Sequence, residues 1–251
     1  EYTCFDGQDG FTQSLCLTNT GVNTSKLNRL ENFIREFEID GKDMSGEELH
    51  TLLDDIDVSM EALNTILKKA QLPLVLDKGE YRKYFQFPVI EYYKKVGFDF
   101  EKTPFPMLAK EYMRYYQPHS MDCSLHDGVT EMLAQLKQKG MHQYLLSASD
   151  LHFLHEQLDN YDIKQYFEQV RGLDNIHAAS KAELAKRFVQ ESGLNPQEVV
   201  FIGDSVHDSE VAHGAGCHCI LIANGHEDKS KLEKTGCVVV DNIRQCESLM
   251  A

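Results

Sequence analysis

Residues 199–216, VVFIGDSVHDSEVAHGAG, join a short apolar run to two acidic residues. The run ends at Gly203, Asp204 follows it directly, and Asp208 comes four residues later. A short apolar run bounded by glycine is typical of a strand buried on both faces of a parallel sheet. In such sheets, ligands bind beyond the carboxyl ends of the strands. This stretch therefore places two carboxylates where a ligand would bind.

The two carboxylates have two interpretations. In the first, Asp204 caps the next helix, and Asp208 is a solvated acid in its first turn, where the helix dipole favours negative charge. In the second, both are oxygen ligands of Mg2+, which needs only one or two carboxylates and completes its octahedron with water and phosphate oxygens. The two acids by themselves do not decide between a structural and a metal-binding role.

The second half of the chain alternates strand-like and helix-like stretches. Residues 126–140 and 180–193 have apolar side chains at helical spacing, and each stretch ends at a glycine. Further short apolar runs lie at 144–150, 217–223 and 237–241. Short strands separated by helices indicate an α/β fold with a Rossmann-like, parallel sheet core.

Two more polar residues belong to this pattern. Ser147 ends the strand-like run 144–150, where its hydroxyl and nearby backbone N–H groups would hold a phosphate oxygen. As an alternative, it caps the helix that begins near Asp150. Lys181 stands at the start of the helix-like stretch 180–193, where a positive charge opposes the helix dipole and so indicates another partner. Lysine is nevertheless common at exposed helix starts. Together with the two acids, Ser147 and Lys181 make up a phosphate clamp with a metal.

The charge of the chain restricts its partners. Lys and Arg number 25 against 40 Asp and Glu, which gives a formal net charge of −15. A surface this acidic repels nucleic acid and anionic membranes, so we expect neither as a partner. A small phosphorylated metabolite is still compatible with this net charge, because hydrogen-bond donors or a bound cation can make the electrostatic potential positive at the binding site. The sequence indicates no particular oligomeric state.

The cellular location follows from three observations on the sequence. No apolar stretch approaches the ~20 residues that span a bilayer. The first ten residues, EYTCFDGQDG, lack the basic and apolar regions of a signal peptide. The seven cysteines are odd in number and without framework spacing, which predicts free thiols. We therefore expect a cytoplasmic protein.

The chain divides into three parts by pattern. Residues 53–120 contain SMEALNTILKKAQLP (59–73) and aromatic-rich, helix-like stretches, which predict a small helical cap domain. Residues 121–251 carry the strand–helix alternation of the core. Residues 1–52 have no assigned role beyond a short first core strand expected at 2–6.

The motifs resemble those of the haloacid dehalogenase-like phosphatases in order and spacing. YLLSAS with Ser147 is similar to the second motif of that family, SKAELAKRF with Lys181 to the third, and VVFIGDSVHDSEVAHGAG to the fourth. The resemblance covers roughly residues 50–250 and is greatest to phosphoglycolate phosphatase-like members with a helical cap.

This resemblance implies a mobile cap, Mg2+ as cofactor, and an aspartate nucleophile that forms an aspartyl phosphate. A second aspartate, two residues after the nucleophile, would protonate the leaving oxygen and then activate water. The resemblance further implies that Ser147 binds phosphoryl oxygens and that Lys181 neutralises charge on nucleophile and phosphate. Asp204 would ligate Mg2+, and Asp208 would ligate it directly or through water.

The first motif of the family, Asp-x-Asp-Gly-Thr, is not intact in this chain. Residues 51–55, TLLDD, match the end of the motif and the segment after it, which puts Glu47 at the nucleophile position without an apolar strand before it. The N-terminus offers Asp6 after a short apolar stretch and Asp9 before Gly10, but three residues apart instead of two. Asp6 is thus the candidate nucleophile and Asp9 the second half of the motif.

The function expected from these features is Mg2+-dependent hydrolysis of a small, phosphoglycolate-like phosphomonoester through an aspartyl phosphate. One alternative is a catalytically silent family member that binds a phosphorylated ligand or a protein partner, because the nucleophile motif is broken. Another is a phosphomutase, which returns the phosphate from the phosphoenzyme. Two basic residues in the expected cap, Arg82 and Lys83, are either solvated helix charges or candidate partners for a substrate carboxylate.

Overall fold

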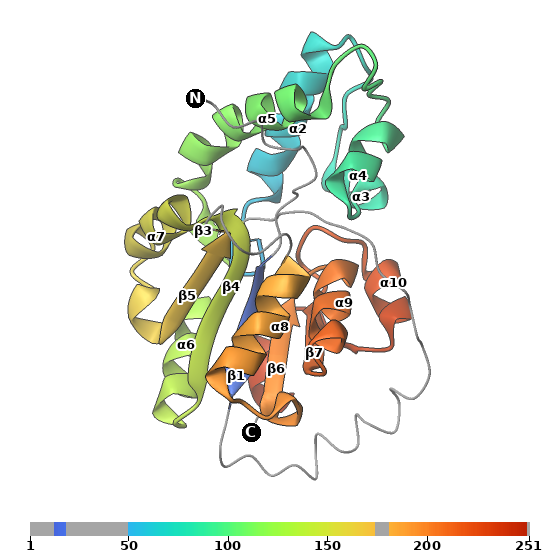
Figure 1. Cartoon of the computed structure of the whole chain (residues 1–251). Coiled ribbons are helices and arrows are strands. Elements are labelled where there is room, and N and C mark those ends of the chain that lie inside the picture. Colours follow the sequence, from blue (N-terminus) through green and yellow to red (C-terminus); the bar gives the residue numbers. More distant parts are fainter. Residues whose placement is uncertain (1–12, 19–49, 174–180, 250–251) are drawn as a thin grey trace.

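The computed structural model describes residues 13–18, 50–173 and 181–249. Among these residues, six strands form one sheet in the order β5-β4-β1-β6-β7-β8 (Figure 1). The strands are β1 Gln13–Thr18, β4 His142–Asp150, β5 Gln169–Leu173, β6 Val199–Gly203, β7 His218–Ile222 and β8 Val238–Val240. β4 and β5 are parallel to each other, and so are β6, β7 and β8, as the alternation of strands and helices predicts.

Helices cover both faces of the sheet. They are α6 Val129–Gln138, α7 Leu151–Asn160, α8 Lys181–Ser192, α9 Val206–Gly214, α10 Lys229–Leu232 and α11 Arg244–Leu249. Alternate residues of β6 face the two layers: Val200 and Ile202 pack with α6 and α7, whereas Val199 and Phe201 pack with α8 and α9. A strand buried on both faces needs a continuous apolar run, which explains the sequence VVFI. The predicted α/β, Rossmann-like class is confirmed.

The central strand, however, runs against its neighbours. β1 lies between β4 and β6 and is antiparallel to both, with Gln13 opposite Ser147 and Leu15 opposite Ile202. The expectation of a fully parallel sheet is therefore wrong for this strand, and the strand expected at 2–6 lies outside the described residues. The side-chain pattern of β1 does not show in which direction the strand runs. The long stretch between β1 and the next strand does not fix the direction either, because the entropy of closing a loop depends only weakly on its length.

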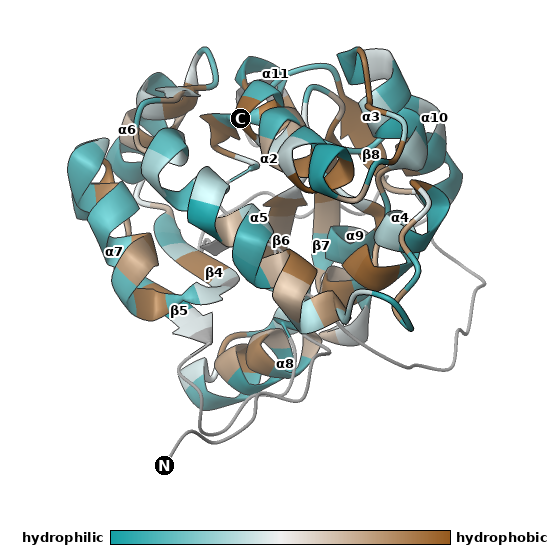
Figure 2. Cartoon of the chain, turned by 90° about the horizontal axis from the view of Figure 1, so that it is seen from above, coloured by the Kyte–Doolittle hydropathy of each residue, from teal (hydrophilic) through white to brown (hydrophobic). Residues whose placement is uncertain are grey.

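A second group of helices lies over the edge of the sheet where β4 and β6 end. These helices are α2 Ile56–Lys69, α3 Lys78–Tyr84, α4 Val89–Lys95 and α5 Phe105–Ser120. Their buried side chains, among them Leu63, Tyr81, Tyr92 and Phe105, form a hydrophobic core of their own. Seen from above, α2 and α5 cross over the strands (Figure 2). The aromatic-rich sequence of this region thus serves packing.

The chain enters and leaves this helical group through a short antiparallel pair of strands. β2 (Leu53–Asp54) pairs with β3 (Ser124–Leu125), with Leu53 opposite Leu125. β2 leads directly into α2, and β3 follows α5. The two connections between the helical group and the core therefore lie side by side.

Local signals in the sequence identify the ends of two helices and several strands. Gly140 and Gly193 follow α6 and α8 with φ of 76° and 65°, values that favour glycine. The pattern does not predict β5 (QVRGL), because this strand mixes polar and apolar residues without clear alternation. Free thiols are found at Cys123, Cys217, Cys219, Cys237 and Cys246. In the part of the chain that the structure describes, no helix combines the length and the apolar character needed to cross a membrane.

Candidate functional site

The predicted site residues gather at the edge of the sheet where β4 and β6 end. Gln13 pairs with Ser147, and Leu15 pairs with Ile202, so Asp204, two residues after Ile202, lies level with Gln13. Ser147 and Asp204 therefore flank the start of β1 from its two sides. The Ser147 hydroxyl accepts a hydrogen bond of 2.9 Å from the backbone N–H of Ser149, which is a local contact near the end of β4.

Lys181 and Asp208 form a fully buried ion pair. The Lys181 Nζ lies 2.7 Å from Asp208 Oδ1, and both side chains are 0% exposed. A cation at the start of a helix requires another partner, and α9 supplies it. A buried ammonium group needs a close counter-ion, because its desolvation without one costs on the order of several kcal/mol. The pair fixes a positive charge beside the end of β6.

The second oxygen of Asp208 holds the turn between β6 and α9. Asp208 Oδ2 accepts hydrogen bonds from the backbone N–H of Asp204 (3.1 Å) and of Ser205 (3.0 Å) and from the Ser205 hydroxyl (2.7 Å). Ser205 caps α9 in return, so the two form a capping box. A Cβ at Gly203 would lie 2.2 Å from the Asp208 Cγ, so this position needs glycine. Asp208 is thus in the first turn of α9, as the structural interpretation expects, but that interpretation is wrong in two respects: Asp208 is buried instead of solvated, and Ser205 instead of Asp204 caps the helix.

Asp204 connects three segments of the chain. Its Oδ1 accepts from the Thr51 hydroxyl at 2.9 Å, and its Oδ2 accepts from the backbone N–H of His226 at 3.0 Å. Gly225 allows the second contact, because a Cβ there would lie 2.2 Å from Asp204 Oδ2. Asp204 is 1% exposed. It is therefore held at the meeting point of β6, the segment before α2 and the loop after β7.

The carboxylates differ in their fitness for Mg2+. Each Asp204 oxygen accepts one hydrogen bond named above, and a carboxylate oxygen has two acceptor positions, so Asp204 retains the capacity to ligate a hard cation. All the contacts of Asp208 named above are with protein donors, three of them on one oxygen. The residues present thus fit Mg2+ with Asp204 as ligand and Asp208 as the group that positions Lys181 and the turn.

Glu227 is a buried acid that no sequence motif indicates. It follows His226 in the loop after β7 and accepts a 2.5 Å hydrogen bond from the backbone N–H of Val206, at the start of α9. Burial raises the pKa of Glu227 to about 7, with Asp204 and Asp208 adding to the increase against the opposing effects of the Val206 N–H and Lys231. The residue is only recognisable in the tertiary structure, because no local pattern places it next to the two aspartates.

This raised pKa predicts a pH-dependent stability. The pKa of Glu227 is near 4.5 in the unfolded chain and about 7 in the folded protein. Between these two pH values, the Glu227 carboxyl is therefore protonated more often in the folded protein than in the unfolded chain. Stability is therefore highest below that window and falls as pH rises through it. Glu227→Gln keeps an acceptor for Val206 and should raise the free energy of unfolding at pH 8 by about 1–3 kcal/mol, with little effect at pH 4. Urea unfolding of both proteins at pH 4 and pH 8 measures this difference in the free energy of unfolding. An equal increase in stability at both pH values would contradict the prediction. Glu233→Gln, at an exposed position, is the control.

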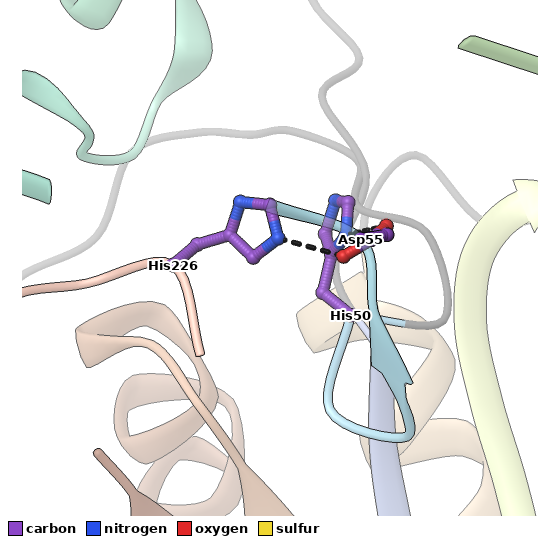
Figure 3. Close-up of side chains that lie close together, drawn as sticks. All are labelled: His50, Asp55 and His226. Atoms are coloured by element: carbon purple, nitrogen blue, oxygen red, sulfur yellow. Dashed lines mark hydrogen bonds and ion pairs between the residues drawn. The ribbon is translucent and has the colours of Figure 1, made fainter. Parts of the chain in front are cut away.

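His50, Asp55 and His226 form a buried polar cluster (Figure 3). The backbone N–H of His226 connects this cluster to Asp204. His50 Nδ1 lies 2.5 Å from Asp55 Oδ2, and His226 Nε2 lies 2.9 Å from Asp55 Oδ1. Burial by itself would raise the pKa of Asp55, but the two imidazoles reverse this effect and hold it well below its ordinary value. Burial and the neighbouring His50 lower the pKa of His226. The sequence does not reveal this cluster, since His226 and Asp55 are far apart in the chain.

The expected nucleophile lies outside the described residues. Asp6, Asp9 and Glu47 all belong to the ranges 1–12 and 19–49. The described chain places Gln13, the first residue of β1, level with Ser147 and Asp204. Since β1 is antiparallel, its carboxyl end lies at the opposite edge of the sheet, away from this site.

Arg82 joins the helical group to the core. From α3, its Nε donates to the Gly225 carbonyl at 2.9 Å and its Nη2 to the Asn224 carbonyl at 3.1 Å. Lys231 of α10 donates in turn to the carbonyls of Arg82 and Phe85. The guanidinium is thus neither a solvated charge nor directed at a substrate carboxylate; it binds the loop that carries His226.

Comparisons with known proteins bear on the fold and the family. A sequence model of the family described as Haloacid dehalogenase-like hydrolase matches residues 50–222. Phosphoglycolate phosphatase 1 of Pseudomonas aeruginosa is 27% identical over 132 residues, which cover 52% of this chain and 48% of that protein. Phosphoglycolate phosphatase of Shigella boydii is 30% identical over 122 residues, or 48% of each chain. The chain thus spans about half the length of these curated relatives.

Solved structures are similar over a larger part of the chain. A haloacid dehalogenase-like family hydrolase from Streptococcus pneumoniae superimposes with a TM-score of 0.69 at 18% identity, covering 80% of this chain and 94% of that one. Protein Tyrosine Kinase A of Mycobacterium tuberculosis has a TM-score of 0.64 at 20% identity, with 80% and 94% coverage. Likeness at such low identity concerns the fold alone, and the two proteins carry the names of different activities.

Proposed function

Since the chain belongs to the haloacid dehalogenase-like hydrolase family, we propose that it hydrolyses a small phosphomonoester of the phosphoglycolate class with Mg2+ bound at Asp204. The observation that carries this proposal is the buried Lys181–Asp208 pair, fixed next to Asp204 at the end of β6. A fixed cation and a metal-binding carboxylate at this edge are what a phosphoryl group requires. The similarity to phosphoglycolate phosphatases supports the substrate class.

Each residue of the site would have its own task in the reaction. The Ser147 hydroxyl and the Lys181 ammonium group bind the non-bridging oxygens of the substrate phosphate. Asp6 attacks phosphorus, the ester P–O bond breaks, and the alcohol leaves with a proton from Asp9. Water then attacks the aspartyl phosphate and releases inorganic phosphate. Bound Mg2+ would neutralise the negative charge of the phosphoryl oxygens.

The helical group would act as the cap of this site. We assign residues 53–120 to a cap domain, 121–251 to the core, and 1–52 to an N-terminal segment. The two connections through β2 and β3 lie side by side, which suits a hinge, and α3 contacts the loop after β7 through Arg82. Closure of such a cap over the substrate would exclude bulk water during formation of the phosphoenzyme.

Binding without turnover is the second candidate function, and the direction of β1 favours it. The described strand between β4 and β6 is antiparallel to both, so its carboxyl end, where the family places the nucleophile, lies at the opposite edge of the sheet. A protein with this arrangement and no other nucleophile would hold a phosphoryl group at Lys181 and Ser147 and stop there.

Phosphate release separates the two candidates. The substrates are 2-phosphoglycolate and p-nitrophenyl phosphate, each assayed with Mg2+ and with a chelator. We expect Mg2+-dependent release, and a loss of at least ~1000-fold when the true nucleophile is replaced in Asp6→Asn or Asp9→Asn. Asp122→Asn, a carboxylate outside the site, should behave as wild type. A folded protein that binds phosphate at the site without releasing any would establish the second candidate instead.

A further inference from the structure

The cluster of His50, Asp55 and His226 brings three potential metal ligands to one buried point. His50 lies just before β2, Asp55 immediately before α2, and His226 in the loop after β7. One ligand atom from each residue lies within 4.8 Å of the other two. His226 and Asp55 are completely buried, and His50 is 5% exposed. Figure 3 shows both imidazole rings beside the same carboxylate.

The kind of donor atom selects the kind of metal. Two imidazole nitrogens and a carboxylate are the donors of open zinc sites and of related transition-metal centres. Mg2+ prefers oxygen donors only and is therefore disfavoured at two histidines. Zinc bonds of ~2.0–2.2 Å put neighbouring ligand atoms ~3.3–3.6 Å apart, so each side chain would move by less than ~1 Å. The close His–Asp contacts of 2.5 and 2.9 Å would open to admit the ion.

Groups around the cluster orient the ligands for this task. The Tyr81 hydroxyl lies 2.8 Å from His226 Nδ1, which leaves Nε2 directed at Asp55. The Tyr116 hydroxyl donates to Asp55 Oδ2. Partners of this type fix the tautomer and the orientation of metal ligands in proteins. The carboxylate of Asp204, bonded to the His226 backbone N–H, adds a second negative charge nearby.

We propose that His50, Asp55 and His226 bind one transition-metal dication of the Zn2+ type, with His50 Nδ1, the Asp55 carboxylate and His226 Nε2 as ligands. A water molecule takes the fourth position. This site is separate from the Mg2+ ligand Asp204 in its residues and donor chemistry. The ion joins the entry to the helical group, at His50 and Asp55, to the core loop at His226, and so fastens the helical group to the core.

The test uses the full chain after a chelator has removed bound metal. Excess Mg2+ is present throughout, so that it occupies sites made of oxygen ligands. Titration with Zn2+ against a competing chelator should show one tight site per chain. His50→Gln and His226→Gln should each weaken it at least ~100-fold, since loss of a direct ligand exceeds the 10–100-fold effect of losing an outer partner. His126→Gln is the matched control, because His126 is buried and contacts Asn224 of the same loop without belonging to the cluster.

Two further measurements keep the proposal falsifiable if a ligand variant unfolds. Tyr81→Phe retains all three ligands and should weaken Zn2+ binding by about 10–100-fold. Co2+ added to the wild-type chain should give the visible bands of a nitrogen–oxygen site without thiolate charge-transfer absorption, which separates this cluster from the cysteines. Absence of stoichiometric Zn2+ binding, thiolate bands as the main spectrum, or full affinity in folded ligand variants would each overturn the proposal. None of these readouts depends on phosphatase activity.

Discussion

Asp208→Ala is expected to lower the free energy of unfolding by about 3–5 kcal/mol. The substitution takes away the carboxylate that lies 2.7 Å from the Lys181 ammonium group, which is 0% exposed. It also removes the acceptor for the backbone N–H groups of Asp204 and Ser205. Loss of a buried carboxylate from a buried ammonium group, and loss of the acceptor for two buried donors, are each among the costliest changes in a protein interior.

Urea unfolding of the purified chain measures this loss. The double variant Lys181→Met, Asp208→Asn removes both charges at nearly constant volume and should recover most of the stability, because a buried ion pair adds little over an apolar pair of the same shape. Asp127→Ala breaks the surface pair with Arg244 and should leave the unfolding midpoint unchanged. If the single and double variants at the buried pair were equally unstable, the isolated charge would not be the cause.

Asp204→Asn is expected to reduce Mg2+-dependent phosphate release by at least ~100-fold. The amide lacks the negative charge that a hard cation requires, and its NH2 group would face a donor, either the Thr51 hydroxyl or the His226 N–H. The initial rate is measured over a range of Mg2+ concentrations, at a temperature where circular dichroism shows the variant to be folded. Saturating Mg2+ should not restore the rate, since the defect is in the ligand itself.

Asp150→Asn is the matched control for this experiment. Asp150 also lies at the end of a strand at the same edge of the sheet and caps a helix, with its Oδ1 accepting from the backbone N–H groups of His152 and Phe153. Asparagine caps helices as well as aspartate does, so the rate should stay at the wild-type level. A wild-type rate in Asp204→Asn would remove Asp204 from the metal site and place the cation elsewhere.

The sequence by itself determined the parts of this protein that depend on local pattern. The run VVFI predicts a strand buried on two faces, and β6 has Val199 and Phe201 on one face and Val200 and Ile202 on the other. A glycine that follows a stretch with apolar residues at helical spacing predicts where α6 and α8 end. Strand–helix alternation predicts the α/β class and therefore the edge of the sheet at which Ser147 and Asp204 lie. Each of these inferences uses residues that are close in the chain.

Only the tertiary structure decided the direction of β1 and the partners of the buried charges. A strand exposes the same hydrogen-bonding groups in either direction, so QSLCLT carries no sign that it runs antiparallel to β4 and β6. The unusual position of Lys181 indicates a missing partner, but the fold alone identifies it as Asp208. Asp55 and His226 are 171 residues apart and meet because β2 and the loop after β7 reach the same edge. Burial makes these contacts important for stability, because a charge or a hydrogen-bond donor that is removed from water costs free energy unless a partner in the folded protein replaces the water.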